Sequence, residues 1–110
     1  MLPVDAQLKA LAEPRRRDIL ALIRDRELAA GQIAAHFEVT RPAISQHLTV
    51  LKEAALVTER RDGARRLYRA DPSGLAGLKQ FIDGFWAAGL ARLKTEVETD
   101  VAGLNETKGH

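Results

Sequence analysis

The chain has 110 residues, of which 45% are hydrophobic and 29% charged, and its formal net charge is +2. This length and apolar content predict one small folded domain and exclude a disordered tail. The absence of cysteine excludes disulfides, thiolate metal sites and cysteine nucleophiles within the chain. No apolar run approaches the ~20 residues of a membrane-spanning helix and no secretory signal is visible, so we expect a cytoplasmic protein.

Two short helices are predicted at the start of the chain. Apolar residues recur at helical spacing over residues 3–12, namely Val4, Leu8 and Leu11. Pro14 ends that segment and favours a second helix to about Arg24, because proline fits the first turn of a helix. The basic run Arg15–Arg17 within this second helix is explained equally well by a DNA contact or by a solvated face.

A helix-turn-helix is predicted over residues 30–54. Residues 30–36 favour a helix that buries Ile33, Ala34 and Phe37, and residues 38–40 form the turn. Thr40 is expected to cap the next helix through its hydroxyl, and Pro42 fits the first turn of that helix. The second helix runs from 41 to 54 and has a stripe of core residues, which we expect to be Ile44, Leu48, Leu51 and Ala55.

The opposite face of the second helix is polar near its N-terminus, where a recognition helix touches base edges in the DNA major groove. Gln46 can pair with an adenine edge, and Arg41 with a guanine edge or a phosphate. Ser45 can pair with either a base or a phosphate. Taken alone, such a helix is more often an ordinary amphipathic helix, but the neighbouring elements favour DNA. The predicted contacts are Thr40, Arg41, Pro42, Ser45, Gln46, His47 and Thr49.

A basic hairpin, or wing, is predicted over residues 57–70. A strand from Val57 to Arg61, an Asp62-Gly63 turn and a returning strand from Arg65 to Ala70 fit its pattern. Between positions 60 and 69 there are five arginines and one acid, a local charge of +4. Such clustering is what a phosphate-facing surface needs. We therefore expect DNA contacts from Arg60, Arg61, Arg65 and Arg66.

A long last helix is predicted over residues 72–101, with Asp71 as its N-cap. Its apolar stripe is longer than a core of this size can cover, which predicts a homodimer formed by helices 3–12 and 72–101. The expected interface residues are Val4, Leu8, Leu11, Leu78, Ile82, Phe85, Trp86, Leu90, Leu93 and Val97. The alternative is that Phe81, Phe85 and Trp86 belong to a monomer core. Residues 1–104 are predicted to form a single domain, and 105–110 a frayed tail.

Four segments of the chain resemble the ArsR/SmtB-type bacterial repressors: Leu8–Leu20, Pro42–Leu51, Ala55–Val57 and Arg61–Gly63. The resemblance covers about residues 4–70, and the last helix matches in role and length more than in residues. It implies a mainly α fold with a small β-hairpin, a winged helix-turn-helix with a long C-terminal dimerisation helix. It also implies a homodimeric repressor that binds an inverted repeat near its promoter and is often released by an inducer.

The chain departs from the metal sensors of that family. Those proteins place cysteines in the first helix of the helix-turn-helix unit, or histidines and carboxylates on the last helix. Here residues 28–33 read LAAGQI, and the three histidines, His36, His47 and His110, lack paired ligand spacing. We therefore predict no transition-metal site and no cofactor, and calorimetry with zinc, nickel or arsenite tests this.

Three classes of function stay open at this point, and a DNA-binding regulator is favoured. A winged-helix module that binds protein instead would predict apolar wing and recognition surfaces. An enzyme is not expected, because the chain has no paired carboxylates in polar surroundings, no glycine-rich phosphate loop and no recognisable serine–histidine–aspartate spacing.

Overall fold

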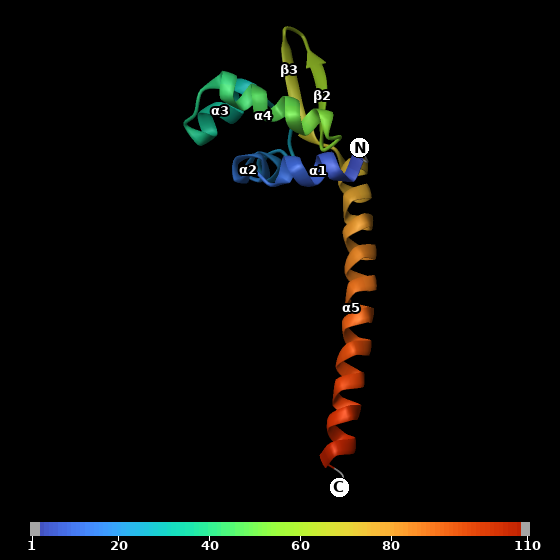
Figure 1. Cartoon of the computed structure of the whole chain (residues 1–110). Coiled ribbons are helices and arrows are strands. Elements are labelled where there is room, and N and C mark those ends of the chain that lie inside the picture. The colour runs from blue at the N-terminus through green and yellow to red at the C-terminus, as the bar shows by residue number, and fades with distance from the viewer. Residues whose placement is uncertain (1–2, 109–110) are drawn as a thin grey trace. The chain divides into compact units, whose positions relative to one another are not determined.

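The computed structural model describes residues 3–108, and the side chains of residues 4–100. The chain divides into two compact units, residues 1–78 and residues 79–110, and each is described by itself. The elements in chain order are α1 (Pro3–Leu11), α2 (Pro14–Leu22), β1 (Leu28–Ala29), α3 (Ala30–Phe37), α4 (Arg41–Glu53), β2 (Val57–Asp62), β3 (Arg65–Ala70) and α5 (Pro72–Lys108) (Figure 1).

The strands form a three-stranded antiparallel sheet in the order β1-β3-β2. Strand β1 is not among the elements predicted from the sequence, because two residues are too few to show an alternating pattern. The β2–β3 turn also lies one residue later than predicted. Asp62 pairs with Arg65, and Gly63 (φ 62°) and Ala64 form the loop between them. A glycine supplies this positive φ without steric strain.

The core of the first unit is built from α1–α4, the sheet and the start of α5. Its fully buried large side chains are Ile19, Ile23, Ile33, Ile44, Leu48, Leu51 and Leu56. The predicted stripe of α4 is therefore confirmed except at Ala55, which is exposed while Ala54 is buried. That prediction was wrong because α4 ends at Glu53 and Ala55 adopts a left-handed φ of 60°.

The helix-turn-helix is closed by local hydrogen bonds. Glu38 takes a left-handed φ of 56°, and the next amide, of Val39, donates to the carbonyl of Ala34 at 3.1 Å. The Thr40 hydroxyl accepts from the amide of Ala43 at 3.3 Å, so the predicted N-cap is confirmed. This turn fixes where α4 begins relative to α3.

The basic run in α2 is used within the fold, an outcome that neither sequence interpretation anticipated. Arg16 Nε donates to the Ala10 carbonyl at 2.6 Å, and Arg17 Nη1 donates to the Leu11 carbonyl at 2.7 Å. These guanidinium groups satisfy carbonyls that the end of α1 leaves without helical partners. The Arg15 guanidinium lies 4.8 Å from the centre of the Phe37 ring, which is half-buried rather than buried as predicted.

The first turns of α5 are joined to α1. Asp71 Oδ1 accepts hydrogen bonds from the amides of Ser73 and Gly74, at 3.0 and 3.3 Å, which confirms the predicted N-cap. The buried Gln7 donates from Nε2 to the Gly74 carbonyl at 3.2 Å. A Cβ atom at Gly74 would overlap the carbonyl oxygen of Ala55, so only glycine fits here.

Helix α5 extends beyond its predicted end at 101 and runs to Lys108. Residues 105–108 are therefore helical where a frayed tail was predicted, and 109–110 lie outside the described residues. The part of α5 in the second unit carries large exposed apolar side chains, namely Phe81, Phe85, Trp86, Leu90, Leu93 and Val97. Phe85 and Trp86 are 62% and 58% exposed, so the described chain does not bury them as a monomer core would.

Candidate nucleic-acid interface

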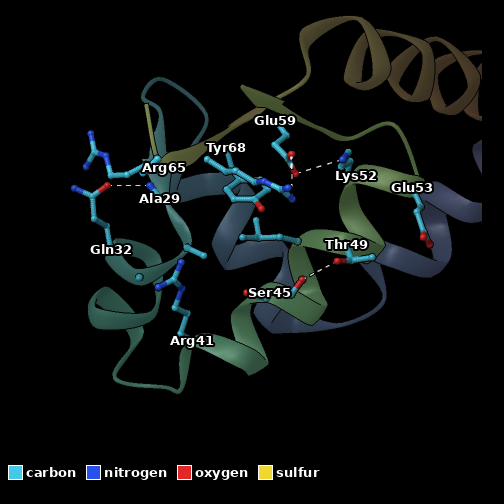
Figure 2. Close-up of a pocket in the computed structure, with 15 residues that line it drawn as sticks. Ala29, Gln32, Arg41, Ser45, Thr49, Lys52, Glu53, Glu59, Arg65 and Tyr68 are labelled. Atoms are coloured by element: carbon cyan, nitrogen blue, oxygen red, sulfur yellow. Dashed lines mark hydrogen bonds and ion pairs between the residues drawn. The ribbon is translucent and has the colours of Figure 1, made fainter. Parts of the chain in front are cut away.

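A hollow of about 940 Å³ lies in the first unit, between α4, the start of α3 and the β2–β3 hairpin (Figure 2). Its lining is mostly polar and charged. The side chains that line it include Gln32, Arg41, Ser45, Thr49, Lys52, Glu53, Glu59, Arg65, Arg66 and Tyr68. Apart from Gln32 of α3, these residues come from the recognition helix and the wing, which the sequence predicted as two halves of one DNA-binding surface.

One face of α4 forms a wall of the hollow. Arg41, Ser45 and Thr49 are four residues apart, so they lie along one side of the helix. The Thr49 hydroxyl donates to the Ser45 carbonyl at 3.0 Å. Pro42 and Gln46 are exposed beside this stripe, on the side of α4 that faces away from the core. Between Arg41 and Thr49, α4 thus presents an amide, two hydroxyls and a guanidinium outward.

His47 lies on another side of α4, against α2. Its Nδ1 is 3.4 Å from Arg16 Nη1, and because a guanidinium can only donate, Nδ1 accepts and the proton of the neutral ring lies on Nε2. Burial lowers the pKa of His47, and the positive charges of Arg16 and Arg15 lower it further while Glu13 opposes them. His47 does not line the hollow formed by the other predicted α4 contacts.

The four predicted arginines of the wing separate into two groups. Arg65 and Arg66 line the hollow, and Arg61 is exposed on the face of β2 that also carries Glu59. Arg60 points to the other face and forms two hydrogen bonds with Glu27, Nε to Oε2 at 2.9 Å and Nη2 to Oε1 at 3.0 Å. This bidentate pair lowers the pKa of Glu27 and raises that of Arg60.

Several lining residues were missed by the sequence predictions, above all Lys52, Glu59 and Tyr68. Glu59 Oε2 is 3.3 Å from Lys52 Nζ, and Glu59 Oε1 is 3.7 Å from Arg66 Nη1. Burial, followed by the charge of Glu59, raises the pKa of Tyr68. The strand register makes Glu59 a direct neighbour of Tyr68. Alternation along the two strands can place Glu59 and Tyr68 on one face of the hairpin, but only the fold shows that this face meets Lys52 of α4.

The charge in the hollow suits an anionic polymer. Four cationic side chains (Arg41, Lys52, Arg65 and Arg66) face two carboxylates (Glu53 and Glu59), which leaves a net positive charge. Arginine and lysine at such a surface bind phosphates, while the hydroxyl and amide groups of α4 can meet base edges. Within the described residues, no group of three or more histidine, aspartate or glutamate side chains is arranged to hold a metal ion.

The side chains predicted for a dimer interface differ in exposure. Leu8 is exposed, and Val4, Leu11 and Ile82 are half-buried. Leu78 is buried in the first unit, so it has little surface to offer a partner. The remaining five, Phe85, Trp86, Leu90, Leu93 and Val97, are more than half exposed.

Helices α3 and α4 with the following β2–β3 hairpin define a winged helix-turn-helix protein. The profile of the family described as "Bacterial regulatory protein, arsR family" matches residues 13–59. The HTH-type transcriptional regulator Rv2034 of Mycobacterium tuberculosis is 46% identical over 86 residues, which cover 78% of this chain and 80% of the relative. The chain therefore belongs to the ArsR family of bacterial transcriptional regulators.

Two further similarities bear on function. The arsenical resistance operon repressor of Staphylococcus xylosus is 34% identical over 69% of this chain and 73% of its own length. The homodimeric winged helix-turn-helix DNA-binding domain Mb0332 of Mycobacterium bovis matches with a TM-score of 0.65 and 33% identity, over 77% of this chain and 79% of that one. Neither protein's ligand or assembly is assigned to this chain by similarity alone.

No helix in the described part of the chain combines the length and the apolar character needed to cross a membrane.

Proposed function

We propose that this protein is a homodimeric repressor that binds a two-fold symmetric DNA site. The hollow between α4 and the wing carries the proposal, because it joins hydrogen-bonding groups and cationic side chains on one concave surface. The protein acts on DNA in the cytoplasm and is a regulator rather than an enzyme. Residues 30–54 read the DNA, the wing (57–70) binds its backbone, and helices 3–12 and 72–101 hold the dimer.

The segment Arg41–Thr49 enters the major groove in this proposal. Gln46 is exposed on the outer side of α4 and is assigned to a base edge, since its amide can both donate and accept toward adenine. Arg41 and Ser45 face the hollow and are assigned to a guanine edge or a phosphate. Thr40 and Pro42 shape the entry of the helix, and Arg61, Arg65 and Arg66 bind phosphates beside the groove.

A second copy of the chain is the proposed partner of the apolar surface on α5. Five large apolar side chains, more than half exposed, are unusual on a surface that faces only water. The homodimeric state of the Mycobacterium bovis relative supports the same assembly here. Two recognition helices related by a two-fold axis would meet successive major grooves, about 34–36 Å apart.

Repression is proposed in preference to activation because the Staphylococcus xylosus relative, which aligns with this chain over 73% of its own length, is named a repressor. A dimer seated on an inverted repeat that overlaps a promoter would exclude the polymerase. A reporter gene under such a promoter should be expressed more strongly when the regulator is deleted, whereas an activator would give the opposite change.

Titration of duplex DNA at 50 and 200 mM salt tests the binding proposal. If Arg41, Arg61, Arg65 and Arg66 of both subunits neutralise phosphates, about eight contacts form and affinity should fall about 10⁴-fold between the two salts. Arg65→Ala should flatten this salt dependence and weaken every sequence alike. Arg60→Gln is the matched control, because Arg60 is paired with Glu27 on the other face of the wing. Weak binding at both salts would favour a protein-interaction module.

A further inference from the structure

A carboxylate occupies the part of the hollow where cations from two elements converge. The side chain of Glu59 is only 20% exposed and faces Lys52 of α4 (Figure 2). It also forms an ion pair with Arg66 of β3. Each of its two oxygens faces a different cation, at 3.3 Å for Lys52 and 3.7 Å for Arg66. Two oxygens bridging two cations is also how a DNA phosphate is held between basic side chains.

The ion pairs of Glu59 contribute little to folding. Lys52 and Arg66 are 52% and 57% exposed, and ion pairs with such exposed partners stabilise proteins weakly. Both distances also exceed those of close charge-assisted hydrogen bonds, about 2.7–2.9 Å. The two cations can therefore exchange Glu59 readily for another anion, such as a backbone phosphate. In the free protein, however, the carboxylate competes with any phosphate that approaches them.

We propose that Lys52 and Arg66 form a DNA-phosphate site whose anion position is taken by the Glu59 carboxylate in the free protein. This inference rests on the proposed function and adds to it a residue that sets affinity rather than sequence preference. When DNA enters the hollow, a backbone phosphate replaces the carboxylate, and Glu59 opposes that exchange by occupying the cations and by repelling the phosphate. The protein thus binds DNA less tightly than its basic residues allow.

The variant Glu59→Gln tests this inference on two duplexes, one selected from a random library by the wild-type protein and one of scrambled sequence. Removal of the charge frees two cations in each subunit. We expect binding of both duplexes to tighten about tenfold or more at 0.1 M salt. The slope of log affinity against log salt concentration should steepen by up to about 0.9 for each carboxylate removed, because Glu59 no longer offsets a phosphate contact. The ratio of the two affinities should change little.

Glu53→Gln is the matched control, because Glu53 lines the same hollow but forms no ion pair with the other side chains described. It removes the same charge without freeing a cation, so its gain should be clearly smaller. In the Glu59→Gln background, Lys52→Gln should reduce the gain in salt dependence, because it removes one of the two freed cations. Thermal unfolding of each variant shows whether the fold is retained.

Several results would overturn the inference. Equal gains in DNA affinity from Glu59→Gln and Glu53→Gln would show that the loss of any negative charge in the hollow has the same effect. Weaker binding of the selected duplex alone would make Glu59 a reader of a cytosine amino group instead. Unchanged binding by Glu59→Gln, with a steep salt dependence in the wild type, would refute the inference and leave the proposed function standing. Failure of the wild type to bind any duplex would refute both.

Discussion

Substitution of Trp86 by alanine should weaken the dimer and leave the subunit folded. Trp86 is 58% exposed in the single chain, and a tryptophan offers about 250 Å², so about 145 Å² of each indole is available to a partner. A symmetric interface buries the residue twice, which makes about 290 Å² for the pair. At about 25 cal/mol per Å², complete coverage would contribute about 7 kcal/mol.

The expected loss is smaller than this upper bound. Alanine retains part of the contact, and two packed helices cover only part of each indole. We therefore expect a loss of about 3–4 kcal/mol, which corresponds to a dimer about 150- to 850-fold weaker. Sedimentation equilibrium over a range of protein concentrations measures this constant directly. DNA binding should weaken with it, because a monomer contacts only one half-site.

Thr95→Ala is the control for this prediction. Thr95 lies nine residues after Trp86, so its side chain projects from the opposite side of α5, and its hydroxyl donates to the Ala91 carbonyl of its own helix. Its loss should leave the dimer constant within about threefold of the wild type. A wild-type protein that stays monomeric at micromolar concentration, or equal effects of the two substitutions, would refute the assignment of this stripe to the dimer.

Three further predictions concern packing, pH and base reading. Gly74→Ala should lower the free energy of unfolding by about 1–3 kcal/mol in denaturant titrations, because its Cβ would overlap the Ala55 carbonyl. Gly77→Ala is the control, and it should be neutral or stabilising because the space around Gly77 is open. The fold lowers the pKa of His47 below 6.5, so the unfolded chain binds more protons than the folded protein just below that pH. The free energy of unfolding should therefore fall as the pH drops through this range, and His47→Gln should make the fall less steep. Gln46→Ala should cost about 1–3 kcal/mol on the selected duplex and little on scrambled DNA; equal losses would exclude it as a base reader.

The helices and the wing could be predicted because their signals are local. The apolar spacing of Ile44, Leu48 and Leu51, the capping hydroxyl of Thr40 and the Asp71-Pro72 start of α5 each determine structure within a few residues. The same reasoning placed the polar face of α4 and the basic wing on the correct elements. Strand β1 was missed because its two residues gain their partners only from β3.

The details of the site depend on contacts between distant residues, which periodicity does not reveal. Arg60 was grouped with the other wing arginines, but its partner Glu27 is 33 residues away in sequence. The Arg15–Arg17 run was interpreted as a DNA contact or a solvated face because the carbonyls that Arg16 and Arg17 bind belong to the end of α1. Likewise, Glu59 acquires its role only when the hairpin register places it near α4.

The structure of the protein bound to its selected duplex is the most direct test of the proposed DNA-binding mode. We expect one dimer on a two-fold symmetric site, with residues 41–49 of each subunit in successive major grooves and Arg61, Arg65 and Arg66 against the flanking phosphates. A complex in which the DNA contacts another surface, or in which α4 packs against the partner subunit and is hidden from the groove, would contradict it.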